Sequence, residues 1–158
     1  MPDLRATFTD TPGVFLQLEV EPGNGPVDDT RLEQFARTLT EQVASAFPSN
    51  AYCFSSFDRR ALAAVKRVAP GTSTTLLYNQ APDAKMLEEL KKLGCDRISV
   101  LPARTQKAFV EAAKKAGFRV AGWSVRTIEQ LAQAQALGLE SVTTDCPRRM
   151  LAEGLGRP

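Results

Sequence analysis

The strongest constraint on the fold is an alternation of short apolar segments with stretches of helical periodicity. After residue 26, apolar side chains at three- and four-residue spacing predict a helix that begins near Asp28 and Asp29, either of which can cap its first turn. The aromatic segment 51–57 then predicts a strand, and Asp58 can cap the next helix. Strands that alternate with helices pair in parallel through right-handed crossovers. The sequence therefore predicts an α/β protein.

The same succession continues to the end of the chain. Gly94, Gly117 and Gly138 each follow a predicted helix, where glycine readily adopts the left-handed turn that ends it. Thr127 and Gln130 can form a capping box. We expect strands at residues 15–20, 51–57, 74–78, 97–101, 119–125 and 141–144. We expect helices at residues 28–47, 58–68, 83–93, 105–116, 127–137 and 148–152.

Two architectures fit this order of elements: a TIM-type barrel and an open doubly wound sheet. No glycine-rich phosphate loop follows any predicted strand, which disfavours the dinucleotide-binding form of the open doubly wound sheet. Six strand–helix units do not close an eight-stranded barrel. We expect residues 1–158 to form a single domain, an incomplete TIM-type (β/α) barrel of about six parallel strands with alternating helices.

Composition excludes several function classes. The formal net charge of +2 is too small to indicate a nucleic acid or an anionic membrane as a partner. No apolar run approaches the roughly 20 residues of a membrane helix, and the N-terminus lacks the pattern of a signal peptide. Cys53, Cys95 and Cys146 are far apart and predict reduced thiols in a cytoplasmic protein. Without histidine or paired cysteines, a structural zinc site is not expected.

Four segments, in order, resemble the glycerophosphodiester phosphodiesterase family. Residues 16–22, Leu-Gln-Leu-Glu-Val-Glu-Pro, are similar to that family's Leu-x-Ile-Glu-Ile-Lys-Pro strand. Residues 54–58, Phe-Ser-Ser-Phe-Asp, resemble its Ser-Ser-Phe-Asp motif. Residues 117–125 and 137–147 resemble its last two strands, which carry Trp-Thr-Val-Asn and Thr-Asp-x-Pro. The resemblance covers nearly the whole chain and implies a TIM barrel.

The resemblance also implies a chemistry: metal-assisted hydrolysis of a glycerol phosphodiester to glycerol 3-phosphate and an alcohol, in lipid and glycerol metabolism. In the family, two histidines act as general acid and base, and three carboxylates hold Ca²⁺ or Mg²⁺. The histidines and two of the carboxylates precede the Glu-Ile-Lys strand, and this sequence starts just before that strand. With no histidine in the chain, we expect no catalytic residue and no hydrolysis by the chain alone.

Glu19 matches the family's third metal carboxylate, and on a strand it shares a face with Glu21. That face can be the barrel interior, where the two would form a weak Ca²⁺ or Mg²⁺ site, or the solvent side of an edge strand. Glu21 stands where the family has lysine, and a glutamate there repels a substrate phosphate by about 1 kcal/mol or more. Glu19 is therefore the expected metal ligand, with Glu21 as a possible second.

The resemblance implies that Trp123 lines the substrate pocket, although a lone tryptophan is more often a core residue. Arg126 stands where the family often has asparagine, and we assign it to substrate binding, with a compensating Glu21–Arg126 ion pair as a hypothesis. Asp145 fits a ligand at a strand end or a helix cap. Phe57 is expected to pack beneath the helix that follows it.

Three functions remain open. The chain can be an inactive binding or assembly module, or part of an active enzyme whose N-terminal strands come from elsewhere. It can also be a structural homo-oligomer in which two six-stranded pieces bury their open edges, since unpaired sheet edges are costly. The expected partner is accordingly a second copy or a chain that supplies the missing strands.

Overall fold

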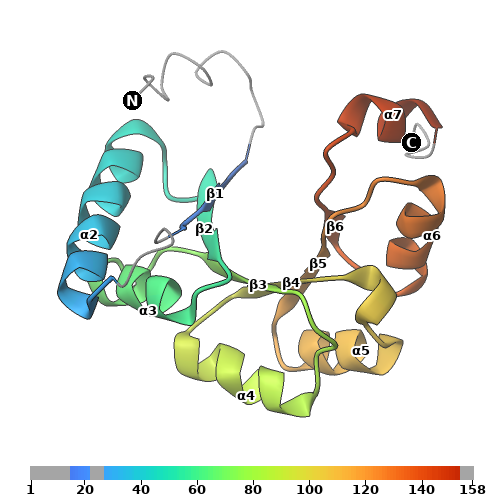
Figure 1. The fold of residues 1–158 in the computed structure, drawn as a ribbon, viewed down its shortest axis with the longest axis horizontal. Coiled ribbons are helices and arrows are strands. Elements are labelled where there is room, and N and C mark those ends of the chain that lie inside the picture. The colour runs from blue at the N-terminus through green and yellow to red at the C-terminus, as the bar shows by residue number, and fades with distance from the viewer. Residues whose placement is uncertain (1–14, 22–26, 154–158) are drawn as a thin grey trace. The chain divides into compact units, whose positions relative to one another are not determined.

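The computed structural model describes residues 15–21 and 27–153, and within them every predicted strand and helix is present. The strands are β1 (Leu16–Glu19), β2 (Tyr52–Ser56), β3 (Thr74–Tyr78), β4 (Arg97–Val100), β5 (Arg119–Gly122) and β6 (Ser141–Val142) (Figure 1). The helices are α2 (Asp29–Ala46), α3 (Arg59–Val68), α4 (Ala84–Leu93), α5 (Lys107–Lys115), α6 (Ile128–Ala136) and α7 (Pro147–Glu153), with a 3-10 turn η1 (Pro102–Arg104).

The strands follow one another in chain order, and the recorded pairings of β1 with β2, β2 with β3, β4 with β5 and β5 with β6 are all parallel. Six parallel strands alternating with helices confirm the predicted fold class, an incomplete TIM-type (β/α) barrel. The chain divides into two compact units, residues 1–76 and 77–158, and each is described by itself. That the whole chain acts as a single domain stays a prediction.

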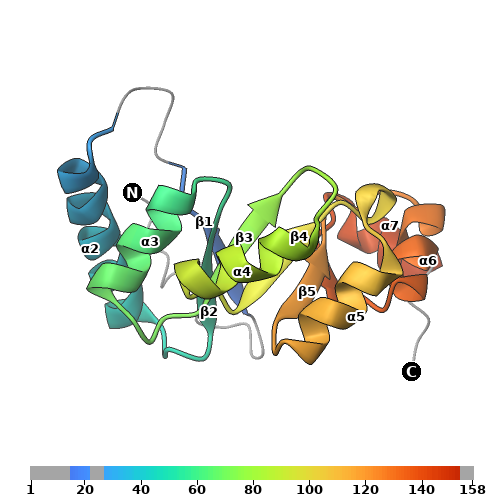
Figure 2. The same ribbon diagram turned by 90° about the horizontal axis from the view of Figure 1, so that it is seen from below.

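In the first unit, one face of β1 and β2 packs against helices α2 and α3, which lie side by side (Figure 2). The apolar cluster joins strand residues to helix residues: Leu16, Val20, Tyr52, Phe54, Leu32, Ala36, Val43, Ala61, Ala64 and Val65. Successive side chains of a strand point to opposite faces. Gln17 and Glu19 therefore lie on the other face, in register with Cys53 and Ser55.

The start of α3 is attached to both strands by one buried hydroxyl. Ser56 Oγ donates to the carbonyl oxygen of Val20 at 2.6 Å and accepts from the backbone N–H of Asp58 at 3.0 Å. Asp58 in turn caps α3 by accepting from the N–H of Arg60. The expectation for Phe57 was wrong: its side chain is 39% exposed rather than packed beneath the helix. Because β2 ends at Ser56 and the cap follows at once, Phe57 lies on the intervening turn.

In the second unit, side-chain caps and a glycine mark the helix ends. Asp83 caps α4 through the N–H groups of Lys85 and Met86, and Thr127 with Gln130 forms the predicted capping box at α6. Gly94 follows α4 at φ 65°, a left-handed conformation that glycine adopts without steric cost. A small apolar cluster, Val125, Leu131, Ala134 and Met150, buries the inner side of α6 and α7.

Two predicted elements of this unit differ from the structure. The helix expected from residue 105 begins at Lys107, because η1 precedes it and Thr105 Oγ1 donates to the carbonyl oxygen of Leu101. The strand expected over 119–125 ends at Gly122. Beyond it, the N–H of Trp123 still donates to Val100, but the N–H of Val125 donates to Thr143. Residues 123–125 are thus hydrogen-bonded on both sides but do not continue β5 as a regular strand. None of the helices in the described residues is both long and apolar enough to span a membrane.

The two serines of β2 differ in their hydrogen bonds, so their substitution tests the structural role of Ser56. Ser55 and Ser56 are both about 1% exposed, but Ser56 Oγ makes two hydrogen bonds whereas Ser55 Oγ makes none with the described residues. We expect Ser56→Ala to lower the free energy of unfolding by about 1–3 kcal/mol, because it leaves buried backbone groups unsatisfied. Ser55→Ala, the matched control, removes an unsatisfied hydroxyl and should leave stability unchanged or raise it. Urea unfolding measures both, and equal losses would contradict the assignment.

Candidate functional site

The sequence-predicted metal ligand Glu19 lies at the C-terminal end of β1, on the face opposite α2 and α3. In a TIM barrel the helices form the outer layer, so the opposite face of the strands is the one that the barrel encloses. Glu19 therefore lies on the strand face that a closed barrel encloses. The sequence alone left this face and a solvent-facing one as alternatives. Its register partner Ser55 contributes a buried hydroxyl without a hydrogen-bond partner among the described residues. This end of the strands is the end at which TIM-barrel active sites are built.

The electrostatic surroundings of Glu19 disfavour its charge. Partial burial, and secondarily the negative charge of Glu21, raise the pKa of the Glu19 carboxyl above its ordinary value of 4.5. A cation bound between these carboxylates would act in the opposite direction, since an opposite charge stabilises the ionised form. The pair is therefore suited to attract a cation or a positively charged side chain.

Two carboxylates do not complete a metal site. Ca²⁺ takes about six to eight oxygen ligands, and Mg²⁺ requires a near-octahedral set. Within residues 15–21 and 27–153, no group of three or more histidine, cysteine, aspartate or glutamate side chains is placed to hold a metal ion. The described residues thus fit a Ca²⁺ or Mg²⁺ ion only as a partial ligand set, and further ligands would have to come from outside them.

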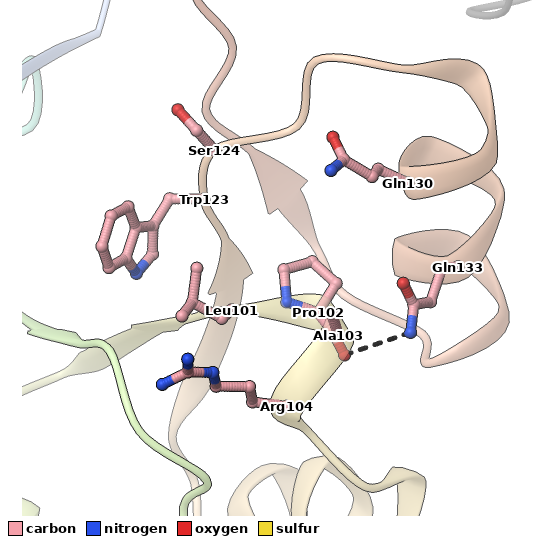
Figure 3. Close-up of a pocket in the computed structure, with 8 residues that line it drawn as sticks. All are labelled: Leu101, Pro102, Ala103, Arg104, Trp123, Ser124, Gln130 and Gln133. Atoms are coloured by element: carbon pink, nitrogen blue, oxygen red, sulfur yellow. Dashed lines mark hydrogen bonds between the residues drawn. The ribbon is translucent and has the colours of Figure 1, made fainter.

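Trp123, the second predicted site residue, is fixed in orientation just beyond β5. Its indole Nε1–H donates to the carbonyl oxygens of Ser99 at 3.1 Å and Tyr78 at 3.3 Å. The ring is half-buried and forms one wall of a small pocket with a volume of about 90 Å³ (Figure 3). The pocket is lined by Leu101, Pro102, Ala103, Arg104, Trp123, Ser124, Gln130 and Gln133. Trp123 thus lines a pocket beside the strand ends, and its contact with a substrate stays a prediction.

The pocket also contains Arg104, which belongs to none of the sequence motifs. Arg104 ends η1, directly after β4, and its Nη1 donates to the carbonyl oxygen of Asn79 at 2.9 Å. Residues that directly follow the parallel strands lie at the end of the barrel where active sites are built. The position of Arg104 directly after a predicted strand is therefore the sequence feature that could have identified it. On the other side, Gln133 Nε2 donates to the carbonyl oxygen of Pro102, a bond drawn in Figure 3.

Arg126, the third predicted site residue, does not line this pocket. Its Nε and Nη2 each lie 2.7 Å from Asp145 Oδ2, so its charge is compensated by a carboxylate of the same unit. Asp145 therefore acts as an ion-pair partner, and Ser124 Oγ donates to the same oxygen at 3.4 Å. The role of Arg126 in substrate binding stays a prediction, as does its pairing with Glu21.

The raised pKa of Glu19 predicts how its substitution changes stability with pH. Because the folded-state pKa is the higher one, the ionised carboxylate costs stability as pH rises above about 4.5 and through the folded-state pKa. In a metal-free buffer, Glu19→Gln should be more stable than the wild type at pH 7, and the gain should vanish near pH 3.

Glu21→Gln removes only the secondary cause and should give a smaller gain over the same pH range. The measurement is urea unfolding of the three proteins from pH 3 to pH 8. A Glu19→Gln protein that is less stable than the wild type at pH 7 would show that Glu19 makes a favourable contact in its charged form.

The comparisons with known proteins bear on the same residues. The sequence model of the glycerophosphoryl diester phosphodiesterase family matches residues 3–149. No curated protein matches the chain.

Solved structures share its fold. A phosphodiesterase of Oleispira antarctica, in complex with the product sn-glycerol-3-phosphate, aligns with TM-score 0.74 and 23% identity over 86% of this chain and 53% of its own. A glycerophosphodiester phosphodiesterase of Parabacteroides distasonis aligns with TM-score 0.69 and 18% identity over 86% and 55%. One from Agrobacterium tumefaciens aligns with TM-score 0.59 and 15% identity over 84% and 52%.

At these identities the structural similarities show the fold alone, and the chain spans about half the length of these solved relatives. The match of the family model is of a different kind, because it covers nearly all of the sequence, including the segments that carry Glu19 and Trp123. The chain therefore belongs to the glycerophosphoryl diester phosphodiesterase family.

Proposed function

We propose that this chain is a glycerophosphodiester phosphodiesterase-like domain that does not hydrolyse phosphodiesters by itself and serves as a binding or assembly module. The observation that carries the proposal is the absence of histidine from all 158 residues. Proton transfer near neutral pH needs a group whose pKa lies close to 7, and histidine is the usual one. Glu19 has a raised pKa, but its side chain is exposed, and desolvation raises a pKa strongly only in buried groups.

The binding part of the proposal rests on the pocket around Trp123. It lies beyond the C-terminal ends of β4 and β5, the end at which TIM-barrel proteins bind their ligands. A rigid aromatic wall, an arginine and amide groups are suitable for a small polar ligand with an anionic group. The Oleispira antarctica relative binds sn-glycerol-3-phosphate. We accordingly propose glycerol phosphates and their diesters as the ligand class.

A second candidate function is an active metal-dependent phosphodiesterase that is completed by strands from elsewhere, either in another chain or in a further part of the same polypeptide. The position of Glu19 favours it. This carboxylate is on the interior type of face at the end of β1, beside Glu21, and its charge is unfavourable without a cation. Added strands carrying histidines and two carboxylates would supply what the Glu19 site lacks. When bound, Ca²⁺ or Mg²⁺ would stabilise the negative charge of the reacting phosphate.

The thiols support a cytoplasmic location. Cys53 and Cys95 are buried, Cys146 is partly exposed, and among the described residues no two cysteines form a disulfide. Reduced thiols of this kind are typical of proteins in a reducing compartment.

Release of glycerol 3-phosphate from glycerophosphocholine, with Ca²⁺ or Mg²⁺, tests the activity. We expect no turnover by the chain alone. Adding a polypeptide that carries the part of the Oleispira antarctica relative outside the aligned 53% tests the second candidate, for which turnover should appear and should fall at least about a hundredfold in Glu19→Gln.

Glu111→Gln, which removes an exposed carboxylate of α5, is the control and should keep the turnover of the completed protein. Turnover by the chain alone that depends on Glu19 would contradict the proposed inactivity. A completed protein that folds but shows no turnover would remove the second candidate and leave the binding module.

The open strands predict self-association. β1 and β6 are the outer strands of the described sheet, each with one strand neighbour, and unpaired strand edges tend to acquire a partner. We expect light scattering to give a mass above that of the 17.2 kDa monomer at micromolar concentration. A clean monomer under these conditions would remove the homo-oligomer as a partner and favour a different chain.

A further inference from the structure

We infer that the pocket beside Trp123 selects glycerophosphodiesters whose alcohol part carries an additional negative charge, and that Arg104 is the residue that determines this preference. The inference rests on the proposed function, because it assumes that the pocket binds glycerophosphodiesters. It adds the class of alcohol, which nothing in the family resemblance specifies for this chain.

The guanidinium of Arg104 is positioned by the loop after β4. Pro102 begins η1, and Thr105 Oγ1 closes the loop by donating to the carbonyl oxygen of Leu101 at 2.8 Å. Arg104 Nη1 is anchored on the carbonyl oxygen of Asn79 at 2.9 Å. Its Nε and Nη2 have no hydrogen-bond partner among the described residues. The anchored arginine thus keeps donors available in the fork geometry that fits a carboxylate or phosphate.

The charge of Arg104 is not neutralised inside the pocket. The other lining residues are apolar or uncharged, and none of the residues that form the pocket is acidic. Asp145, an acidic residue close to Ser124, is bound to Arg126 at 2.7 Å. The pocket therefore has a net positive charge, and a ligand with a second anionic group compensates it.

The remaining polar groups also favour an anion. Gln130 Oε1 accepts from the N–H groups of Arg126 and Thr127, so the Nε2 amide group is the part of this side chain left to donate. Figure 3 shows this nitrogen on the side of the amide that faces Pro102. Arg104, which ends η1, and Gln130, in the first turn of α6, both line this pocket and both carry hydrogen-bond donors.

The same geometry disfavours a quaternary ammonium. The half-buried indole of Trp123 is the kind of surface on which such a cation binds through cation–π attraction. Here, however, the ring shares its pocket with a guanidinium that has no acidic partner there, and like charges repel. A choline group therefore gains less from Trp123 than an uncharged alcohol would, and an anionic alcohol gains from both residues.

The test uses Trp123 as its own reporter. It is the single tryptophan of the chain, so a change in tryptophan fluorescence reports on this pocket. The chain is titrated with pairs of diesters that differ by one anionic group. Glycerophosphoserine against glycerophosphoethanolamine tests a carboxylate, and glycerophosphoinositol 4-phosphate against glycerophosphoinositol tests a phosphate. We expect the more anionic member of at least one pair to bind about two- to fivefold more tightly, the range for an ion pair near solvent. The pair that shows it identifies the group.

Arg104→Gln should abolish the preference, and Arg104→Lys, which keeps the charge, should retain part of it. Arg148→Gln is the matched control, because it removes the same charge from an exposed position on α7 and should leave the preference intact. Far-ultraviolet circular dichroism and a melting curve establish that each variant is folded. Equal affinities within both pairs, a preference unchanged in Arg104→Gln, or no fluorescence response to any diester would overturn the inference.

The release of glycerol 3-phosphate tests the proposed function separately from the charge preference of the pocket. If Glu19-dependent turnover appears in the chain alone, the binding-module proposal fails whatever Arg104 does. If the diesters bind without a charge preference, the proposed function stands and the inference about Arg104 falls.

Discussion

Burial of one face of β1 and β2 against α2 and α3 is the constraint on which the first unit depends. Side chains of a strand alternate between faces, so fixing Leu16, Tyr52 and Phe54 in the apolar core places their neighbours on the opposite side. Glu19 and Ser55 lie there for this reason, not because they attract each other. Burying the core residues stabilises the unit by about 1.5–3 kcal/mol for each large side chain, far more than a repulsion between two partly solvated carboxylates costs. The protein can therefore hold Glu19 beside Glu21 in a state that raises its pKa.

In the second unit, backbone hydrogen bonds at the strand ends perform a similar task. Carbonyl oxygens of Ser99 and Tyr78 hold the indole of Trp123, and that of Asn79 holds Arg104. Both side chains are thus oriented by main-chain groups, whose positions follow from strand pairing. Preorganisation of this kind lowers the entropy that a ligand must remove on binding. It supports the proposal that this pocket binds a ligand.

Family membership and catalytic competence are separate properties of this chain. The match of the family model covers residues 3–149, yet the chain lacks the histidines on which the family's proton transfers depend. What remains is one carboxylate with the family's position, a neighbouring glutamate where the family has a cation, and an aromatic pocket. On these features we base the proposal that the chain binds a polar ligand and that hydrolysis needs groups supplied by other strands.

The sequence by itself determined the order and type of the elements, the caps at Asp58 and Thr127, and the family. Periodicity and capping depend on residues within a few positions of one another, so they are legible in a single sequence. Strand ends were less predictable, as β5 shows, because a ladder stops where its neighbours stop. Only the tertiary structure decided that Arg126 pairs with Asp145, that Phe57 is exposed and that Arg104 shares a pocket with Trp123. Arg126 and Asp145, like Arg104 and Trp123, lie 19 residues apart in the sequence. Strand pairing, not local sequence, brings the two members of each pair together.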